Sequence, residues 1–127
     1  MNGYISRARE ALTSAQLLFD AGQLAGAANR AYYAFFHAAQ ATLAQVTALN
    51  PRTIKIHQGL RRLFDLHVVK TGLIKEAVAA DFSSVSSTRI IADYGDAPLQ
   101  REEVEASIER ARAFVEACDQ LIREPKP

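Results

Sequence analysis

The sequence is poor in the residues that cross-link, break or kink protein chains. Its 127 residues include one cysteine, four prolines, six glycines and no tryptophan. One cysteine excludes an intramolecular disulfide and a multi-cysteine zinc site. No run approaches the ~20 apolar residues of a membrane span, and no long apolar segment follows Arg7 and Arg9 as in a signal peptide. We therefore expect no membrane association and a cytoplasmic location.

The charges are nearly balanced, with 15 Lys and Arg, 14 Asp and Glu, and a net charge of +1. This balance excludes a strongly basic nucleic-acid tail and an acidic disordered chain. The length fits one ordinary domain. We expect that domain to span residues 1–123, with a frayed tail at 124–127.

Alanine is abundant, and alanine is the best helix former because its side chain loses no entropy on ordering. No stretch alternates like a strand. Apolar residues recur at helical spacing in five segments, at about residues 3–21, 23–49, 56–70, 75–94 and 99–123. The segment at 75–94 is the weakest, because its hydroxyl side chains compete for backbone partners. Short connections between helices predict an all-α, up-and-down antiparallel bundle of about five helices.

The second segment carries a polar strip opposite its broad apolar side. Arg30 and His37 are seven residues apart, so they lie within about 20° of each other around the helix axis and roughly 10 Å apart along it. Arginine binds phosphate with paired donors, and histidine moves protons near neutral pH. The strip therefore predicts either a phosphate site or a solvated surface. The three histidines show no recognised metal spacing, so we expect no metal.

Residues 30–39, Arg-Ala-Tyr-Tyr-Ala-Phe-Phe-His-Ala-Ala, resemble the signature helix of the HEPN (higher eukaryote and prokaryote nucleotide-binding) family. The resemblance continues through residues 55–59, 69–72, 89–94 and 111–115 and covers nearly the whole chain.

The resemblance implies a dimerising helical bundle. Many members are metal-independent RNases with an Arg-x4–6-His motif and no cofactor, and Arg30 and His37 match it at its longest spacing. His37 would be the general base or acid, and Arg30 would stabilise the charge on the phosphate. Bacterial members are often toxins neutralised by a minimal nucleotidyltransferase. The resemblance thus implies a homodimer, an RNA or nucleotide ligand and such a protein partner.

Two positions depart from the toxin pattern. Ala31 stands where active toxins often have a polar residue, and Ala39 stands where some carry a tyrosine that receives a nucleotide. Two alternatives therefore remain: a non-catalytic module that partners a nucleotidyltransferase, and a purely structural dimerising bundle.

Further candidates surround the motif. Asn29, Tyr33 and Gln40 lie on the same polar strip. His57 resembles the family's second histidine. A structural role, in which His57 starts a helix and bonds to nearby backbone, is an equal alternative. Lys55 belongs to segment 52–75, which contains six basic residues and one acidic residue. This excess of positive charge predicts either a surface that binds the phosphate backbone or a solvated surface. Arg89 and Asp93 have the spacing of a helical ion pair, Tyr94 could cap that pair, and Cys118 lies on an apolar stripe.

Overall fold

A computed structural model describes residues 3–47, 57–95 and 98–124, and at positions 57, 58, 83 and 92–94 it describes the backbone alone. The helices are α1 (Gly3–Asp20), α2 (Leu24–Val46), α3 (His57–Phe64), α4 (Glu76–Tyr94) and α5 (Arg101–Arg123); the π-helix η2 (Asp65–Val69) continues α3 directly. No strand occurs within the described ranges. The prediction of an all-α bundle is confirmed.

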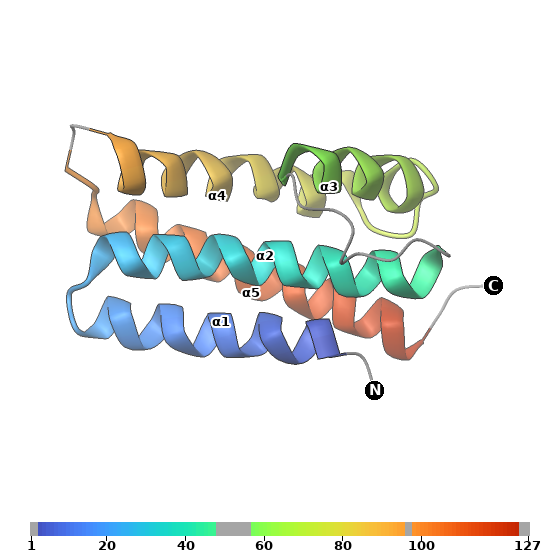
Figure 1. The fold of residues 1–127 in the computed structure, drawn as a ribbon, viewed down its shortest axis with the longest axis horizontal. Helices are drawn as coiled ribbons and strands as arrows, with labels where there is room; N and C mark the ends of the chain where they lie inside the picture. The colour runs from blue at the N-terminus through green and yellow to red at the C-terminus, as the bar shows by residue number, and fades with distance from the viewer. Residues whose placement is uncertain (1–2, 48–56, 96–97, 125–127) are drawn as a thin grey trace.

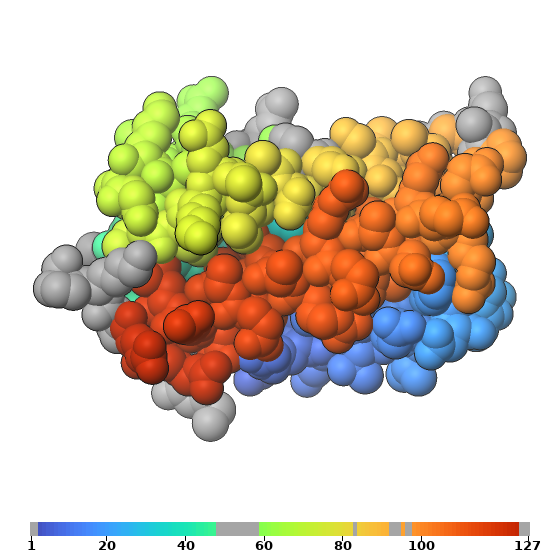
Figure 2. Space-filling model, turned by 180° about the vertical axis from the view of Figure 1, so that it is seen from behind, coloured from blue at the N-terminus to red at the C-terminus, as the bar shows by residue number. Residues whose placement is uncertain are grey.

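The helix α2 is the central element of the bundle. It contacts α1, α3, α4 and α5, and Figure 1 shows α1 on one side of it, α4 on the other and α5 behind. Most of its alanines, among them Ala28, Ala31 and Ala39, are fully buried. Their small side chains let neighbouring helices approach closely on several sides. From behind, α5 forms much of the surface between α1 and the α3–α4 layer (Figure 2).

Local signals set the helix ends. Gly22 adopts a left-handed conformation with a φ of 78°. The Gln23 N–H donates to the Leu18 carbonyl at 2.8 Å, and the Gly22 N–H donates to the Phe19 carbonyl at 3.0 Å. This pair of bonds is a Schellman motif, which satisfies carbonyls at the end of α1. Gly72 ends the helical segment after η2 in the same way, with a φ of 80°.

The core is aromatic at its centre. Phe35 of α2 stacks on Phe114 of α5 with ring centroids 4.5 Å apart. Phe82 of α4 and Phe64 of α3 pack against Phe114 at 5.9 and 5.3 Å. Cys118 is also fully buried, as its apolar stripe predicts, and burial raises the pKa of its thiol to about 12.

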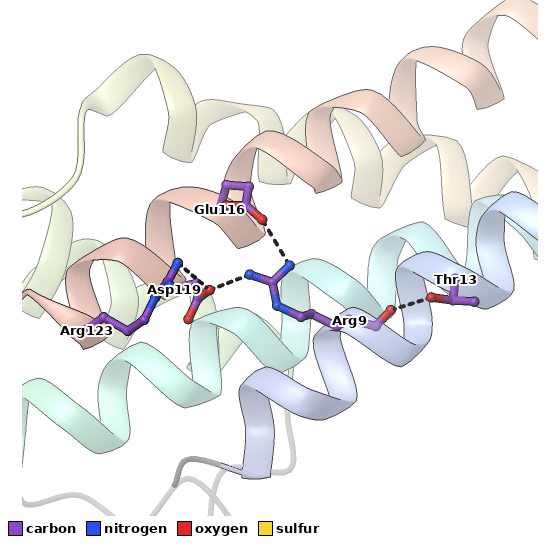
Figure 3. A network of polar contacts seen from close by, with 5 residues as sticks. All are labelled: Arg9, Thr13, Glu116, Asp119 and Arg123. Carbon is purple, nitrogen blue, oxygen red and sulfur yellow. Dashed lines mark hydrogen bonds and ion pairs between the residues drawn. The ribbon is translucent and has the colours of Figure 1, made fainter.

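A polar network joins α1 to α5 at the bundle surface (Figure 3). Arg9 donates to Glu116 at 2.9 Å and to Asp119 through its other terminal nitrogen. Arg123 also binds Asp119, at 3.1 Å. The Asp119 side chain is only 12% exposed, so two cations compensate one largely buried carboxylate.

The π-helix is the main local feature that the sequence did not predict. The Lys70 N–H donates to the Asp65 carbonyl, five residues back, at 2.9 Å. Such wider turns are rare and occur often at functional sites. The apolar spacing of residues 56–70 predicts a helix but does not distinguish an α turn from a π turn.

Candidate functional site

The ring of Tyr33 lies between the two motif residues on α2. The guanidinium carbon of Arg30 is 4.9 Å from the centre of this ring, and the His37 ring centroid is 6.0 Å from it. The helix thus brings Arg30 and His37 to one aromatic side chain, as their spacing predicts. An arginine over a tyrosine face gains a cation–π attraction, which limits where the guanidinium points.

Arg30 is half-buried and bound to its neighbour. The Asn29 Oδ1 accepts hydrogen bonds from Arg30 Nη2 at 3.2 Å and from Nε at 3.4 Å. No ion pair involves Arg30 among the described residues. Its charge is therefore not neutralised by a described carboxylate, and its other terminal nitrogen remains able to donate to a phosphate.

His37 is also half-buried, and its ring contacts Gln40. The Nδ1 of His37 lies 2.9 Å from the Gln40 Oε1, and because an amide oxygen only accepts, Nδ1 is the donor. The neutral ring then presents an unprotonated Nε2, which is the form of a general base. Gln40 is buried, so its position supports a role in orienting His37 rather than the direct RNA contact that we expected.

The surroundings of His37 favour its neutral form. Burial lowers the pKa of His37 below 6.5; the hydrogen bond that His37 donates to Gln40 opposes that shift, and the charges of Arg7 and Arg30 add to it. Desolvation and nearby like charges both disfavour an imidazolium. The imidazole is therefore uncharged at neutral pH, although cations surround it.

Two arginines of this site were not among the predicted site residues. Arg89 of α4 lies 5.0 Å from the Tyr32 ring centre and 5.9 Å from that of Tyr33. Arg7 of α1 stands close enough to His37 to lower its pKa. Nothing in their local sequence indicates this convergence, because the packing of α1 and α4 against α2 brings the side chains together.

The other predicted residues have different outcomes. Lys55 lies outside the described residues, and His57 begins α3 but its side chain is not described. The same holds for the side chains of Asp93 and Tyr94, so their predicted association with Arg89 stays a prediction. Tyr32 belongs to the core, and burial raises the pKa of its phenol to about 12.

The motif face is the surface formed by Arg30, Tyr33 and His37 on α2. A depression of about 730 Å³ lies between α3, η2 and α4, and neither Arg30 nor His37 lines it. Within the described ranges, no group of three or more His, Cys, Asp or Glu could hold a metal ion. In the same ranges, no helix combines the length and apolarity needed to cross a membrane.

Comparisons with known proteins agree with the resemblance in the sequence. The family model described as "HEPN domain" matches residues 1–121. A Methanocaldococcus jannaschii protein named "Putative toxin MJ0605" is 35% identical over 120 residues, which are 94% of this chain and 87% of that protein. "UPF0332 protein PH1297" of Pyrococcus horikoshii is 41% identical over 76 residues, which are 60% of this chain and 51% of that protein.

Proposed function

Because the chain belongs to the HEPN family, we propose that it binds RNA at the face formed by Arg30, Tyr33 and His37 and cleaves it as an endoribonuclease. One observation carries this proposal. A guanidinium without a described carboxylate partner and an imidazole with a lowered pKa flank the same tyrosine ring. This pairing supplies a phosphate-binding cation next to a base that is neutral near pH 7.

In the proposed reaction the 2′-hydroxyl of the RNA attacks the adjacent phosphorus. The Nε2 of His37 takes the hydroxyl proton as the bond from the 2′-oxygen to phosphorus forms. The bond from phosphorus to the 5′-oxygen breaks, and that oxygen leaves with a proton from solvent. The products are a 2′,3′-cyclic phosphate and a 5′-hydroxyl end, and no metal ion is required.

Arg30 has the role of charge stabilisation in this scheme. Its guanidinium donates to the non-bridging phosphate oxygens, on which negative charge grows in the transition state. Asn29 holds the guanidinium through Oδ1. Arg89 and Arg7 add positive potential from α4 and α1, which attracts the RNA backbone.

The proposal extends to assembly and biological role. The name "Putative toxin MJ0605" of one relative supports a toxin–antitoxin function, with a minimal nucleotidyltransferase as the neutralising partner. We further propose a cytoplasmic homodimer in which two motif faces act on one strand. Ala39 has no hydroxyl to receive a nucleotide, so neutralisation would depend on binding or on another residue.

The test is cleavage of end-labelled RNA by the purified chain in EDTA. We expect cutting that leaves 2′,3′-cyclic phosphates, is lost in His37→Ala and Arg30→Ala, and persists in Arg112→Gln, which removes an exposed arginine of α5. Cleavage that survives His37→Ala would remove that residue from the mechanism. No cutting, combined with tight binding of a co-expressed nucleotidyltransferase, would replace the enzyme with the interaction module.

A further inference from the structure

The depression between α3, η2 and α4 is a separate feature from the motif face. Its volume of about 730 Å³ falls in the range of roughly 300–1,000 Å³ that is usual for small-molecule sites. Phe64 of α3 and Phe82 of α4 both line it. Both rings are almost fully buried, so they supply an apolar wall rather than an exposed stacking surface.

Two adjacent arginines provide positive charge at this depression. Arg61 and Arg62 of α3 both line it. The Arg61 guanidinium carbon lies 5.5 Å from the centre of the Phe82 ring. Arg62 is exposed and makes no ion pair within the described part of the chain. A planar guanidinium resting on an aromatic ring is a surface on which a nucleobase can stack.

Two carboxylates balance these cations. Asp65 is the first residue of η2, and Glu76 is the first residue of α4; both line the depression. Asp65 has a distant ion pair with Lys70 at 3.7 Å, whereas Glu76 has none within the described ranges. Two carboxylates disfavour an isolated phosphate but accept hydrogen bonds from the amino groups of a nucleobase.

The lining therefore fits a whole nucleotide better than it fits a phosphate alone or a nucleobase alone. Arg61 and Arg62 match the phosphate, and Asp65 and Glu76 match the donors on a base edge. Adenine, cytosine and guanine carry an exocyclic amino group, whereas uracil has none: its single ring donor, N3–H, lies between two carbonyl oxygens that carboxylates repel. The charge pattern thus discriminates among bases.

A chain of ring contacts connects the depression with the motif face. Phe82 contacts Tyr32 with ring centroids 5.9 Å apart, and Tyr32 contacts Tyr33 at 5.3 Å. Arg61 of α3 reaches the same Phe82 ring, with its guanidinium carbon 5.5 Å from the ring centre. These ring contacts through the buried Tyr32 show that the two regions lie close together in the fold, and single-strand sites commonly span about 4–16 nucleotides, so one strand of RNA is long enough to reach both.

We propose that the α3–α4 depression is a second subsite for the RNA bound at the motif face, and that it takes a flanking nucleotide whose base carries an amino group. This inference rests on the proposed function for the strand itself. It gives the protein a base preference at a position away from the bond that is cut. Sequence-specific RNA recognition commonly uses such unstacked bases.

The test measures binding of fluorescent 2′-O-methyl hexanucleotides, which cannot be cleaved because the nucleophilic hydroxyl is blocked. We expect the adenine and cytosine hexamers to bind about tenfold more tightly than the uracil hexamer, a ratio typical of one discriminating base contact. Glu76→Gln should reduce that preference. Arg62→Gln should weaken binding of all three hexamers several-fold, whereas Arg112→Gln provides the matched loss of one positive charge on α5.

The outcomes separate this inference from the proposed function. Weakening by Arg30→Ala but not by Arg62→Gln overturns the second subsite and leaves the motif face. Weakening by Arg62→Gln but not by Arg30→Ala overturns the proposed function and supports the subsite. Equal affinity for the adenine and uracil hexamers overturns the base preference. Circular dichroism of each variant establishes that its helices are intact.

Discussion

The imidazole of His37 and the side-chain amide of Gln40, one turn apart on α2, face each other with 2.9 Å between Nδ1 and Oε1. Gln40 is 8% exposed, so packing restricts its amide. The bond keeps the proton of the neutral ring on Nδ1 and leaves Nε2 as the basic nitrogen. The reactivity proposed for His37 thus depends on a buried neighbour.

Replacing Gln40 tests this arrangement without reference to activity. Gln40→Met keeps the shape of the side chain but removes the acceptor, so the proton of His37 should no longer be held on Nδ1. The hydrogen bond with Gln40 raises the pKa of His37, so losing this bond should lower the pKa further. Nitrogen-15 NMR of the imidazole reports both quantities, and the signals of His67 serve as the internal control. An unchanged tautomer would contradict the role of Gln40.

Arg7 should contribute to the pKa of His37 from a different helix. Its charge lowers that pKa, so Arg7→Gln should raise the pKa towards 6.5 and move the acidic limb of RNA cleavage to higher pH. Proton NMR titration of His37 measures the shift. Arg112→Gln removes an equal charge elsewhere and should leave the titration unchanged; an equal shift in both variants would make Arg7 irrelevant.

The same lowered pKa predicts how stability varies with pH. The folded protein disfavours protonated His37, so the unfolded chain binds more protons below pH 6.5. This contribution to stability is fully present above pH 6.5 and is lost as pH falls through the lower folded pKa. Thermal melts of the wild type and of His37→Gln should therefore diverge in this range, with the wild type losing more stability on acidification. Parallel curves would contradict the prediction.

Tyr33 should act through its ring rather than through its hydroxyl. Tyr33→Phe keeps the surface under Arg30 and should bind RNA nearly as well as the wild type. Tyr33→Leu removes the ring that positions the Arg30 guanidinium through a cation–π contact of about 0.5–2 kcal/mol, and we expect a loss of affinity of at most roughly thirtyfold. Fluorescence anisotropy with 2′-O-methyl RNA measures both variants. Equal losses in the two would assign the effect to the hydroxyl instead.

The network between α1 and α5 should stabilise the fold unequally through its two carboxylates (Figure 3). Asp119→Ala removes a largely buried acceptor shared by Arg9 and Arg123, and we expect a loss of about 1–3 kcal/mol in the free energy of unfolding. Glu116→Ala removes an exposed partner and should cost about 0–1 kcal/mol. Urea denaturation compares them, and a larger effect at Glu116 would reverse this assignment.

Much of the architecture is encoded locally. The boundaries expected for the first helix differ little from those of α1, because Gly22 supplies a left-handed residue that few others adopt. The hydroxyl-rich segment is helical as α4 in spite of its composition. The Thr88 hydroxyl donates to the Ser84 carbonyl at 3.2 Å, so the side chain bonds to the helix backbone instead of interrupting it.

The candidate site was only partly predictable. Arg30, Tyr33 and His37 share one face because the pitch of an α-helix fixes their directions, whatever surrounds the helix. The burial of Gln40 was not predictable in this way, because the exposed width of the polar strip on α2 depends on how closely neighbouring helices pack. The contact of Arg89 with two tyrosine rings of α2 was not predictable from its own helix, and its pairing with Asp93 stays a prediction.

The sequence by itself determined the helices, the family and the pairing of an arginine with a histidine on α2, since each depends on the order of residues within one segment. Tertiary structure decided which cations join that pair, how the pKa of His37 moves and where the α3–α4 depression lies. These properties depend on distances between helices remote in the chain. Such distances follow from the packing of the whole core, which no single segment encodes.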